Sequence, residues 1–327
     1  KIKSRPLKKG QILVQIYYSG ACRSQLMEAR GLRGFDKWLP HLLGHEGSGK
    51  VIDIGPGVTK FKEGDEVILS WIKSSGLEAE GAIYDSTMGK VNSGQVTTFS
   101  NYSVVSENRL IKKPINIDFD VSILMGCALP TGAGMVLNEL DISHKSKVVV
   151  IGLGGIGLSA LAMLLSLDVE NIIAVDLSEE KLNLVRSWGV KNTINPLKTD
   201  VLNEVKDLFK NGADFCLESA GTIQTIELGF SLLDNKKGKL LFASHPPEGE
   251  KISLYPHELI TGKKIEGSWG GAVNPDMDIP KFSELLLSAD FPLKSLLSKP
   301  YTLNEINTVL EDIELGKVLR PLIKMEH

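Results

Sequence analysis

The feature that most constrains the fold is a glycine-rich turn between a strand-like and a helix-like segment. Residues 148–151 are four apolar residues typical of a short buried strand. Gly152-Leu153-Gly154-Gly155-Ile156-Gly157 follows, and a helical run covers 156–167. In such a turn the first glycine bends the chain, the second lets the backbone approach a pyrophosphate, and the third lets helix and strand pack closely. The helix N-terminus then faces the phosphates, so the segment predicts a dinucleotide site.

Strand-like and helix-like segments alternate around this turn from about 129 to 268. Strands are expected at 148–151, 172–176, 193–195, 213–218 and 239–243, and helices at 156–167, 179–187, 200–209 and 223–233. This alternation predicts an α/β fold with a doubly wound parallel sheet, a Rossmann domain over 129–268.

The second expected strand of this domain ends in Asp176, 24 residues after Gly152. A carboxylate there accepts hydrogen bonds from the adenosine ribose 2′- and 3′-hydroxyls and repels a 2′-phosphate, so NAD is favoured over NADP. Leu177 and Ser178 follow, and no arginine stands beside Asp176 to bind that phosphate. The alternative is a packing turn with Asp176 as cap of the next helix. The cofactor residues expected here are Gly152, Gly154, Gly155, Ile156, Gly157 and Asp176.

The flanking regions have a different character. Residues 11 to about 125 are rich in glycine, with strands expected at 11–18, 49–54 and 65–70, which indicates a mostly-β domain. Residues 71–100 have little periodicity and are expected to form a long loop. Two helices between 280 and 316 and a strand at 318–323 are expected near the end. We therefore expect the first domain to comprise 1–128 and 269–327.

Composition agrees with this plan and excludes several classes of protein. The 327 residues suggest about two domains. With 42% hydrophobic and 24% charged residues, disorder and a collagen-like chain are excluded. A net charge of −3 gives no basic surplus for nucleic-acid binding. Twenty uncharged residues lie between Lys147 and Asp168, but a strand, a glycine turn and a helix explain them without a membrane.

Cysteine is scarce, with only Cys22, Cys127 and Cys216. This odd, small number is not a disulfide framework and favours a reducing compartment, the cytoplasm. It is also too small for a four-cysteine zinc site. Cys216 is flanked by Phe215 and Leu217, and we interpret it as a structural residue of a strand.

Three segments carry candidate metal ligands. Gly44-His45-Glu46 opens a Gly-His-Glu-x-x-Gly-x5-Gly-x-x-Val pattern, Cys22 lies in Gly20-Ala21-Cys22-Arg23-Ser24, and Cys127 lies in Gly126-Cys127-Ala128-Leu129-Pro130-Thr131-Gly132. A Cys₂His set is typical of catalytic zinc, which takes three protein ligands and keeps one position open. Taken singly, a cysteine is more often a buried apolar residue and a histidine a hydrogen-bonded structural one.

Together these segments resemble the zinc-dependent alcohol dehydrogenases of the medium-chain dehydrogenase/reductase superfamily. The motifs follow one another in the family's order over nearly the whole chain. They are the three segments above, the glycine turn and the terminal Gly316-Lys317-Val318-Leu319-Arg320. The resemblance implies a GroES-like, mostly-β catalytic domain beside the Rossmann domain. It also implies a small-molecule alcohol or carbonyl substrate and assembly as a homodimer or homotetramer.

The resemblance implies a role for each matching residue on the metal side. Cys22, His45 and Cys127 would bind one catalytic zinc, and Glu46 would approach or tune the metal. Ser24 would hydrogen-bond the substrate hydroxyl and accept its proton. Zinc stabilises the alkoxide, which passes a hydride to the nicotinamide.

On the cofactor side, the resemblance implies five further contacts: Arg23 and Arg320 on the pyrophosphate, Lys181 on the ribose, and Thr131 and Trp269 near the nicotinamide. Trp71 lies where the family places an aromatic near the substrate. For Trp71 and Trp269, core packing is an equal alternative.

The sequence departs from the family's pattern at three places. Residues 71–100 lack the four cysteines of the family's structural-zinc lobe, so no second zinc is expected. Gln25 stands where an aspartate commonly orients the zinc-binding histidine, and lacks its charge. Met27 lies near a position where some members place a proton-relaying histidine.

Several functions remain to be distinguished. The leading hypothesis is an NAD-dependent zinc alcohol dehydrogenase, and Cys127 favours it over polyol dehydrogenases, which often lack that cysteine. A polyol, sugar or specialised-metabolite substrate stays open. A zinc-free enoyl or quinone reductase would lack the ligand set, and a non-catalytic nucleotide-binding protein would show neither zinc nor turnover.

Overall fold

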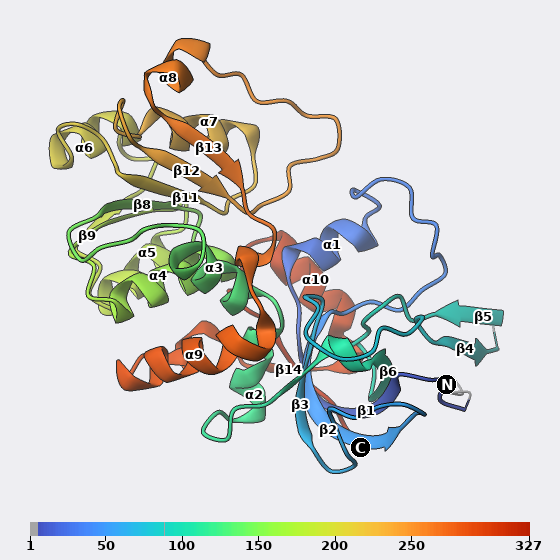
Figure 1. Cartoon of the computed structure of the whole chain (residues 1–327). Helices are drawn as coiled ribbons and strands as arrows, with labels where there is room; N and C mark the ends of the chain where they lie inside the picture. The colour runs from blue at the N-terminus through green and yellow to red at the C-terminus, as the bar shows by residue number, and fades with distance from the viewer. Residues whose placement is uncertain (1–5, 88) are drawn as a thin grey trace. The chain divides into compact units, whose positions relative to one another are not determined.

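The structure, a computed structural model, describes residues 6–87 and 89–327, whose contacts fall into two units (Figure 1). The first unit takes the chain up to Ala128 together with 274–284 and 292–327. The second takes 129–273 and 285–291.

The second unit is built on a six-stranded parallel sheet in the order β10–β9–β8–β11–β12–β13. The strands are β8 (Lys147–Ile151), β9 (Asn171–Val175), β10 (Asn192–Ile194), β11 (Phe215–Glu218), β12 (Lys239–Phe242) and β13 (Lys264–Gly267). The order reverses between β8 and β11, which is the switch point where doubly wound sheets bind ligands. This topology confirms the predicted Rossmann fold.

Helices cover both faces of this sheet (Figure 1). They are α3 (Ala128–Leu137), α4 (Gly155–Ser166), α5 (Glu179–Ser187), α6 (Val201–Leu208), α7 (Ile223–Ser231) and α8 (Pro256–Thr261). On one face, Val205 of α6 and Phe230 of α7 join Val149 of β8 in a buried cluster. Because β8 is buried on both faces, its run of β-branched residues shows no alternation.

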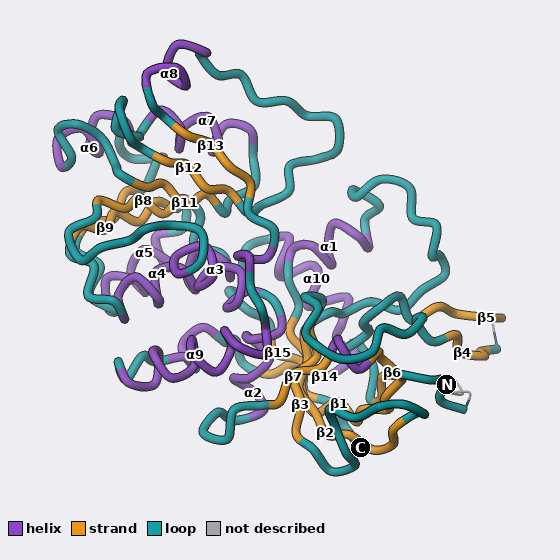
Figure 2. Tube along the Cα trace, in the orientation of Figure 1, coloured by secondary structure: helices purple, strands orange, loops and turns teal. Residues whose placement is uncertain are grey.

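The first unit is built on a mostly antiparallel seven-stranded sheet, seen as the lower group of orange strands in Figure 2. Six strands follow the order β14–β15–β1–β2–β3–β7, and β6 pairs with β1. Ile12, Val14 and Ile16 alternate along β1 and are fully buried, as a half-covered sheet requires. The strands are β1 (Gln11–Gly20), β2 (Glu46–Ile54), β3 (Glu66–Ser70), β6 (Tyr102–Ser106), β7 (Leu110–Lys112), β14 (Pro300–Thr302) and β15 (Leu322–Lys324).

Short helices complete this unit. They are α1 (Arg23–Ala29), α2 (Phe119–Ser122), α10 (Ile306–Glu314) and the 3₁₀ turns η1 (Glu107–Arg109), η2 (Ile123–Gly126), η4 (Leu293–Leu296) and η5 (Leu303–Glu305). Helix α9 (Pro275–Ser288) contributes residues to both units. Among the described residues, no single helix has the length and apolar character to cross a membrane. One bent pair of segments, Phe119–Gly126 and Ala128–Leu137, passes that test by length and composition alone.

The structure corrects three expectations. The segment 71–100 is not one loop, because it contains the hairpin β4 (Ile83–Ser86) and β5 (Gly89–Asn92), whose strands are too short to show a period. The last strand begins at Leu322 rather than 318, since Pro321 before it has no N–H to donate to a sheet.

The third difference concerns the return of the chain to the first unit. Residues 269–273, which include the 3₁₀ turn η3 (Gly270–Ala272), lie in the second unit instead of the first. Asn138 donates to the carbonyl of Gly271 there. Residues 285–291 also belong to the second unit, where the ring of Phe291 packs edge-on against Trp188 at 4.9 Å.

Glu107 fixes the start of the segment 71–100 to the sheet. Its Oε1 accepts the backbone N–H groups of Thr59 and Lys60 at 2.7 and 2.6 Å, and its Oε2 accepts that of Leu77 at 2.7 Å. Burial opposes the charge of Glu107, but these donors outweigh it and lower its pKa. The carboxylate therefore contributes stability above the ordinary carboxyl pKa, and this is lost as the pH falls through the lowered value.

We expect Glu107→Gln to lower the free energy of unfolding by about 2 kcal/mol at pH 7. The amide NH2 of glutamine takes the place of one carboxylate oxygen and cannot accept a hydrogen bond from a backbone N–H. The difference from the unmodified chain should shrink as the pH falls below about 4. Urea unfolding at several pH values measures it. Glu80→Gln in the same segment is the control, since Glu80 is exposed and its ion pair with Lys8 spans 3.4 Å. Equal losses in the two variants would contradict this role of Glu107.

Candidate metal and cofactor sites

The three predicted metal ligands converge within the first unit, although 105 residues separate Cys22 from Cys127. Cys22 caps α1, His45 directly precedes β2, and Cys127 lies at the break between η2 and α3. One ligand atom from each lies within 4.8 Å of the others, and Cys22 Sγ is 3.2 Å from His45 Nε2. A cluster of this size fits around one ion.

The chemistry of this donor set fits zinc. Two thiolates and an imidazole are soft and intermediate donors, the combination of many zinc sites. A hydrogen bond from the Cys127 thiol lowers the pKa of Cys22 well below the usual range, and the same bond raises that of Cys127. Burial opposes the charged form of His45, but the charge of Cys22 outweighs it and raises the pKa of His45. Of the two thiols, that of Cys22 therefore has the lower pKa.

Glu46 and Arg320 form a buried ion pair in the same unit. Arg320 Nη2 donates to Glu46 Oε2, and both side chains are almost fully buried. Burial raises the pKa of Glu46 despite the opposing charge of Arg320. Glu46 Oε1 has no hydrogen-bond partner among the described residues. This leaves one acceptor for a group that the protein itself does not supply.

Glycines on two sides make room for Glu46. A Cβ on Gly20 would lie 2.9 Å from Glu46 Cδ, and one on Gly126 would lie 2.8 Å from Glu46 Cβ. Gly20 lies two residues before Cys22 and Gly126 directly before Cys127, so the buried glutamate explains the glycines near two of the predicted ligands.

The predicted proton acceptor and one predicted phosphate ligand lie on α1. Ser24 is half-buried, and its Oγ is 2.7 Å from Cys22 Sγ. Arg23 is exposed at the first position of α1. The cap of this helix therefore brings Ser24 to the candidate metal ligands.

The glycine-rich turn of the second unit has the geometry that its sequence predicts. Gly152 has φ +87°, and a Cβ there would lie 2.5 Å from Ala220 N. A Cβ on Gly157 would lie 1.9 Å from the carbonyl oxygen of Gly152, whereas one on Gly154 meets no described atom within 4 Å. Gly152 and Gly157 are thus required by close packing, whereas Gly154 leaves space for a ligand at the N-terminus of α4.

This contrast predicts opposite effects for two alanine variants. Gly157→Ala should lower the free energy of unfolding by about 3 kcal/mol through overpacking. Gly154→Ala should cost less than about 1 kcal/mol of stability. It should nevertheless weaken NAD binding about tenfold by blocking an approach to the pyrophosphate. Urea unfolding and calorimetric NAD titration measure these effects. Unchanged NAD affinity in Gly154→Ala would argue against a phosphate site here.

Asp176 is tied to the glycine turn. Its Oδ2 accepts the backbone N–H of Leu153 at 2.6 Å, its Oδ1 accepts that of Ser178 at 2.8 Å, and Lys181 Nζ lies 3.7 Å from Oδ2. The cap of α5 is Ser178, whose side chain accepts from the Lys181 N–H, so Asp176 is not the helix cap.

The remaining predicted residues have different surroundings. Thr131 is buried in α3, whereas Trp269 is 68% exposed and packs edge-on against His245 at 5.7 Å. The carbonyl of Trp71 accepts from Arg109 Nη1. Cys216 is fully buried in β11, and burial raises its thiol pKa well above the usual value.

Two groups were missed by sequence reasoning. Glu218 ends β11 at the switch point, and its Oε1 accepts from the N–H groups of Ala220 and Gly221 at 2.8 Å. The sequence signal that could have pointed to Glu218 is its position as an acidic residue at the end of an expected strand. The second is the cluster of Glu28 on α1 with Asp36 and His41 from the segment after it, where His41 Nε2 lies 2.6 Å from Asp36 Oδ2.

Comparison with known proteins agrees with this architecture. Residues 8–115 match the alcohol dehydrogenase GroES-like domain, and residues 155–288 match the zinc-binding dehydrogenase family. S-(hydroxymethyl)glutathione dehydrogenase of Escherichia coli is 29% identical over 348 residues, covering 98% of this chain and 94% of that protein.

Solved structures give the same result. Benzyl alcohol dehydrogenase of Acinetobacter calcoaceticus superposes with a TM-score of 0.89 at 29% identity, covering 99% of this chain and 94% of that one. An alcohol dehydrogenase zinc-binding domain protein of Burkholderia ambifaria has a TM-score of 0.89 at 26% identity, covering 100% and 94%.

The GroES-like and Rossmann units, with a Cys₂His cluster in one and a dinucleotide turn in the other, define a zinc-type dehydrogenase. The chain belongs to the zinc-dependent alcohol dehydrogenase family of the medium-chain dehydrogenase/reductase superfamily. It is an oxidoreductase of the kind that uses zinc and a nicotinamide dinucleotide.

Proposed function

We propose that this chain transfers a hydride between a small alcohol, or its carbonyl form, and NAD at one catalytic zinc held by Cys22, His45 and Cys127. The convergence of one ligand atom from each of these residues within 4.8 Å carries the proposal. Three protein ligands leave a fourth position for substrate, as in catalytic zinc sites.

The residues around the metal ligands have defined tasks in this proposal. Zinc, when bound, withdraws electron density from the substrate hydroxyl and makes its proton easier to remove. Ser24 Oγ accepts that proton, and its position 2.7 Å from Cys22 Sγ supports this role. Glu46 tunes the charge of the site from its buried position beside Arg320. The carbon of the alcohol gives a hydride to the nicotinamide and the hydroxyl gives its proton to Ser24, so two electrons and two protons leave the substrate in all.

The second unit supplies the cofactor site in this proposal. Gly152, Gly154, Gly155, Ile156 and Gly157 hold the pyrophosphate at the N-terminus of α4. Asp176 and Lys181 bind the adenosine ribose, and the carboxylate selects NAD over NADP. Arg23 and Arg320 would contact the pyrophosphate. A guanidinium has five N–H donors, so its bond to Glu46 leaves Arg320 others to give. Thr131 and Trp269 are proposed near the nicotinamide.

We further propose that the chain has no structural zinc. The segment 71–100 contains no cysteine, and Glu107 holds its start through three backbone N–H groups. The three free cysteines support a reducing compartment, the cytoplasm. The outer strand β13, with exposed Tyr255 at the cap of the preceding helix α8 and exposed Ile260 within it, supports assembly as a homodimer or homotetramer.

The proposal is tested by following nicotinamide reduction with a panel of primary, secondary, polyol and sugar alcohols, each with NAD and with NADP. We expect turnover with a small alcohol and NAD. Activity confined to polyols or sugars would assign the chain to that alternative branch of the superfamily. No turnover of any alcohol or carbonyl, in either direction, would contradict the proposal.

A further inference from the structure

Trp269 lies on a tight turn directly after β13, the edge strand of the parallel sheet. β13 ends at Gly267, and the turn continues through Ser268, Gly270 and Gly271. Gly271 has φ +69°, a left-handed conformation that favours glycine. The side chain of Trp269 is 68% exposed, so it does not pack in the core of the second unit. The turn thus presents a large aromatic ring to solvent.

Helix α3 packs closely against this turn. A Cβ on Gly271 would lie 2.6 Å from the carbonyl oxygen of Thr131, and one on Gly134 would lie 2.3 Å from that of Gly271. Side chains do not come so close to backbone atoms, so only glycine fits at both positions. The helical turn that contains Thr131 therefore contacts the turn that carries Trp269. The two residues proposed near the nicotinamide are thus brought to one place.

Two side chains from the end of α3 and just beyond it hold the turn. Ser268 Oγ donates to Glu139 Oε2 at 2.5 Å and accepts the backbone N–H of Gly271 at 3.1 Å. Asn138 Nδ2 donates to the carbonyl of Gly271 at 3.2 Å. Ser268 is buried, so water competes little for its hydrogen bonds. Glu139, Ser268 and Gly271 together form the Ser268 clamp.

The strand order places this turn at one end of the expected dinucleotide. Asp176, the proposed ribose ligand, follows β9, and the proposed phosphate turn follows β8. β11, β12 and β13 continue the sheet on the other side of β8. A dinucleotide lies across the switch point of such a sheet, outside the carboxyl ends of its strands. Its nicotinamide half therefore extends over β11 and β12 toward the turn after β13.

We propose that Glu139 and Ser268 are positioning residues for the nicotinamide ring. Through the Ser268 clamp they hold Trp269 in place as a platform against which that planar ring packs. A platform that is ordered before binding avoids the entropy cost of ordering it with the ligand. Aromatic rings also attract each other beyond the effect of the area that they bury. This inference rests on the proposed function, because it takes a nicotinamide dinucleotide as the ligand of the second unit.

The test compares the affinities of NADH and ADP-ribose for the full chain by calorimetric titration. ADP-ribose has the adenosine, the pyrophosphate and the second ribose of NADH but lacks the nicotinamide. Glu139→Ala and Ser268→Ala should each weaken NADH binding about fivefold through the lost hydrogen bonds and leave ADP-ribose binding unchanged. Glu139→Gln should bind NADH as the unmodified chain does, because its amide oxygen still accepts from Ser268 Oγ.

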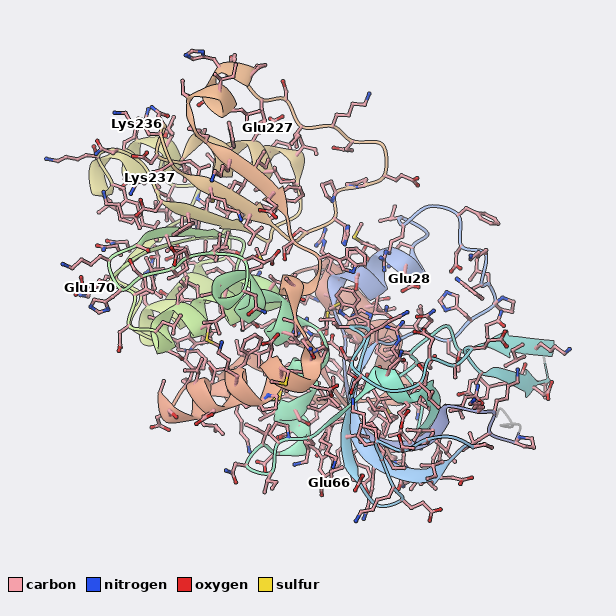
Figure 3. All side chains as sticks on the ribbon, viewed as in Figure 1. Glu28, Glu66, Glu170, Glu227, Lys236 and Lys237 are labelled. Carbon is pink, nitrogen blue, oxygen red and sulfur yellow. The ribbon has the colours of Figure 1, made fainter. Side chains whose placement is uncertain are left out.

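Glu170→Ala is the matched control for removal of a carboxylate. Glu170 is exposed and directly precedes β9, at the amino end of the sheet (Figure 3). Its replacement should change neither affinity. Equal losses in Glu139→Ala and Glu139→Gln would assign the effect to charge instead of the hydrogen bond and overturn the clamp. A matching loss of ADP-ribose affinity would also overturn it, since the effect would not be confined to the nicotinamide.

A double-variant cycle shows whether Glu139 acts through Trp269. Trp269→Ala should weaken NADH binding about tenfold, the loss expected for one ring-stacking contact. Glu139→Ala should cause no further loss in the chain that already carries Trp269→Ala. An undiminished effect of Glu139→Ala in that chain would mean that Glu139 acts elsewhere, which contradicts its positioning role.

Hydrogen exchange of the cofactor-free chain gives a readout that needs neither ligand nor activity. The amide N–H groups of residues 268–271 should exchange faster in Glu139→Ala than in Glu139→Gln or Glu170→Ala. Equal exchange in all three variants would refute the clamp. Failure of the unmodified chain to bind either NADH or ADP-ribose would instead contradict the proposed function, so the two failures are distinguishable.

Discussion

Replacing Cys127 with serine should remove bound zinc and lower kcat/KM for alcohol oxidation by about a thousandfold or more. A serine hydroxyl stays protonated near neutral pH and is a poor zinc ligand, so only Cys22 and His45 remain. Metal activation of a substrate oxygen is worth several kcal/mol, which corresponds to about three powers of ten in rate. Steady-state kinetics and zinc content of the purified variant measure the effect.

Cys216→Ser is the matched control for this experiment. Cys216 is fully buried in β11, in the second unit, and lies outside the Cys₂His cluster. Its replacement buries a hydroxyl and should lower the free energy of unfolding by about 1–3 kcal/mol while leaving zinc content and kcat/KM unchanged. Retention of zinc and activity in Cys127→Ser would contradict the proposed ligand set.

Replacing Asp176 with asparagine should reduce the preference for NAD over NADP by about a hundredfold. The neutral amide loses charge-assisted bonds to the ribose hydroxyls, worth about 1.5–3 kcal/mol, and no longer repels a 2′-phosphate. The variant should have a lower kcat/KM with NAD and a higher kcat/KM with NADP than the unmodified chain. Kinetics with the two cofactors at a fixed alcohol concentration measure the ratio.

Asp200→Asn serves as the control for cofactor choice. Asp200 caps α6 in the same unit by accepting from Asn203, and asparagine is an equally good cap. Its removal of one negative charge should leave the cofactor ratio unchanged. An unchanged ratio in Asp176→Asn, or an equal change in Asp200→Asn, would mean that Asp176 does not select the cofactor.

The cofactor unit was predictable because its signals are local. The glycine turn, the buried strand before it and Asp176 after it are fixed by backbone sterics and short-range periodicity. The edge strand β13 and helix α8 were not expected, since the polar sequence of Lys264–Gly267 and the six-residue Pro256–Thr261 carry weak periodicity. Pro321 indicated that β15 starts late, but the apolar residues of 318–323 led to an earlier predicted start.

The metal cluster was predictable only through the order of motifs, since spacing alone does not bring Cys22 and Cys127 together. Other parts of the site depend on contacts that no local pattern encodes. The pair Glu46–Arg320 joins residues 274 positions apart. Gln25 likewise contacts Gly44, Glu28 and His45. The sequence therefore showed that the carboxylate common in the family is missing here, but not which groups surround the amide in its place.

The most direct test of the central claim is to measure zinc content and alcohol-dependent NAD reduction on the same purified chain, before and after metal removal and zinc restoration. We predict one zinc per chain, loss of turnover on removal, and its return with zinc. Undiminished turnover in the metal-free chain, or a zinc-free chain as purified that zinc does not activate, would contradict it.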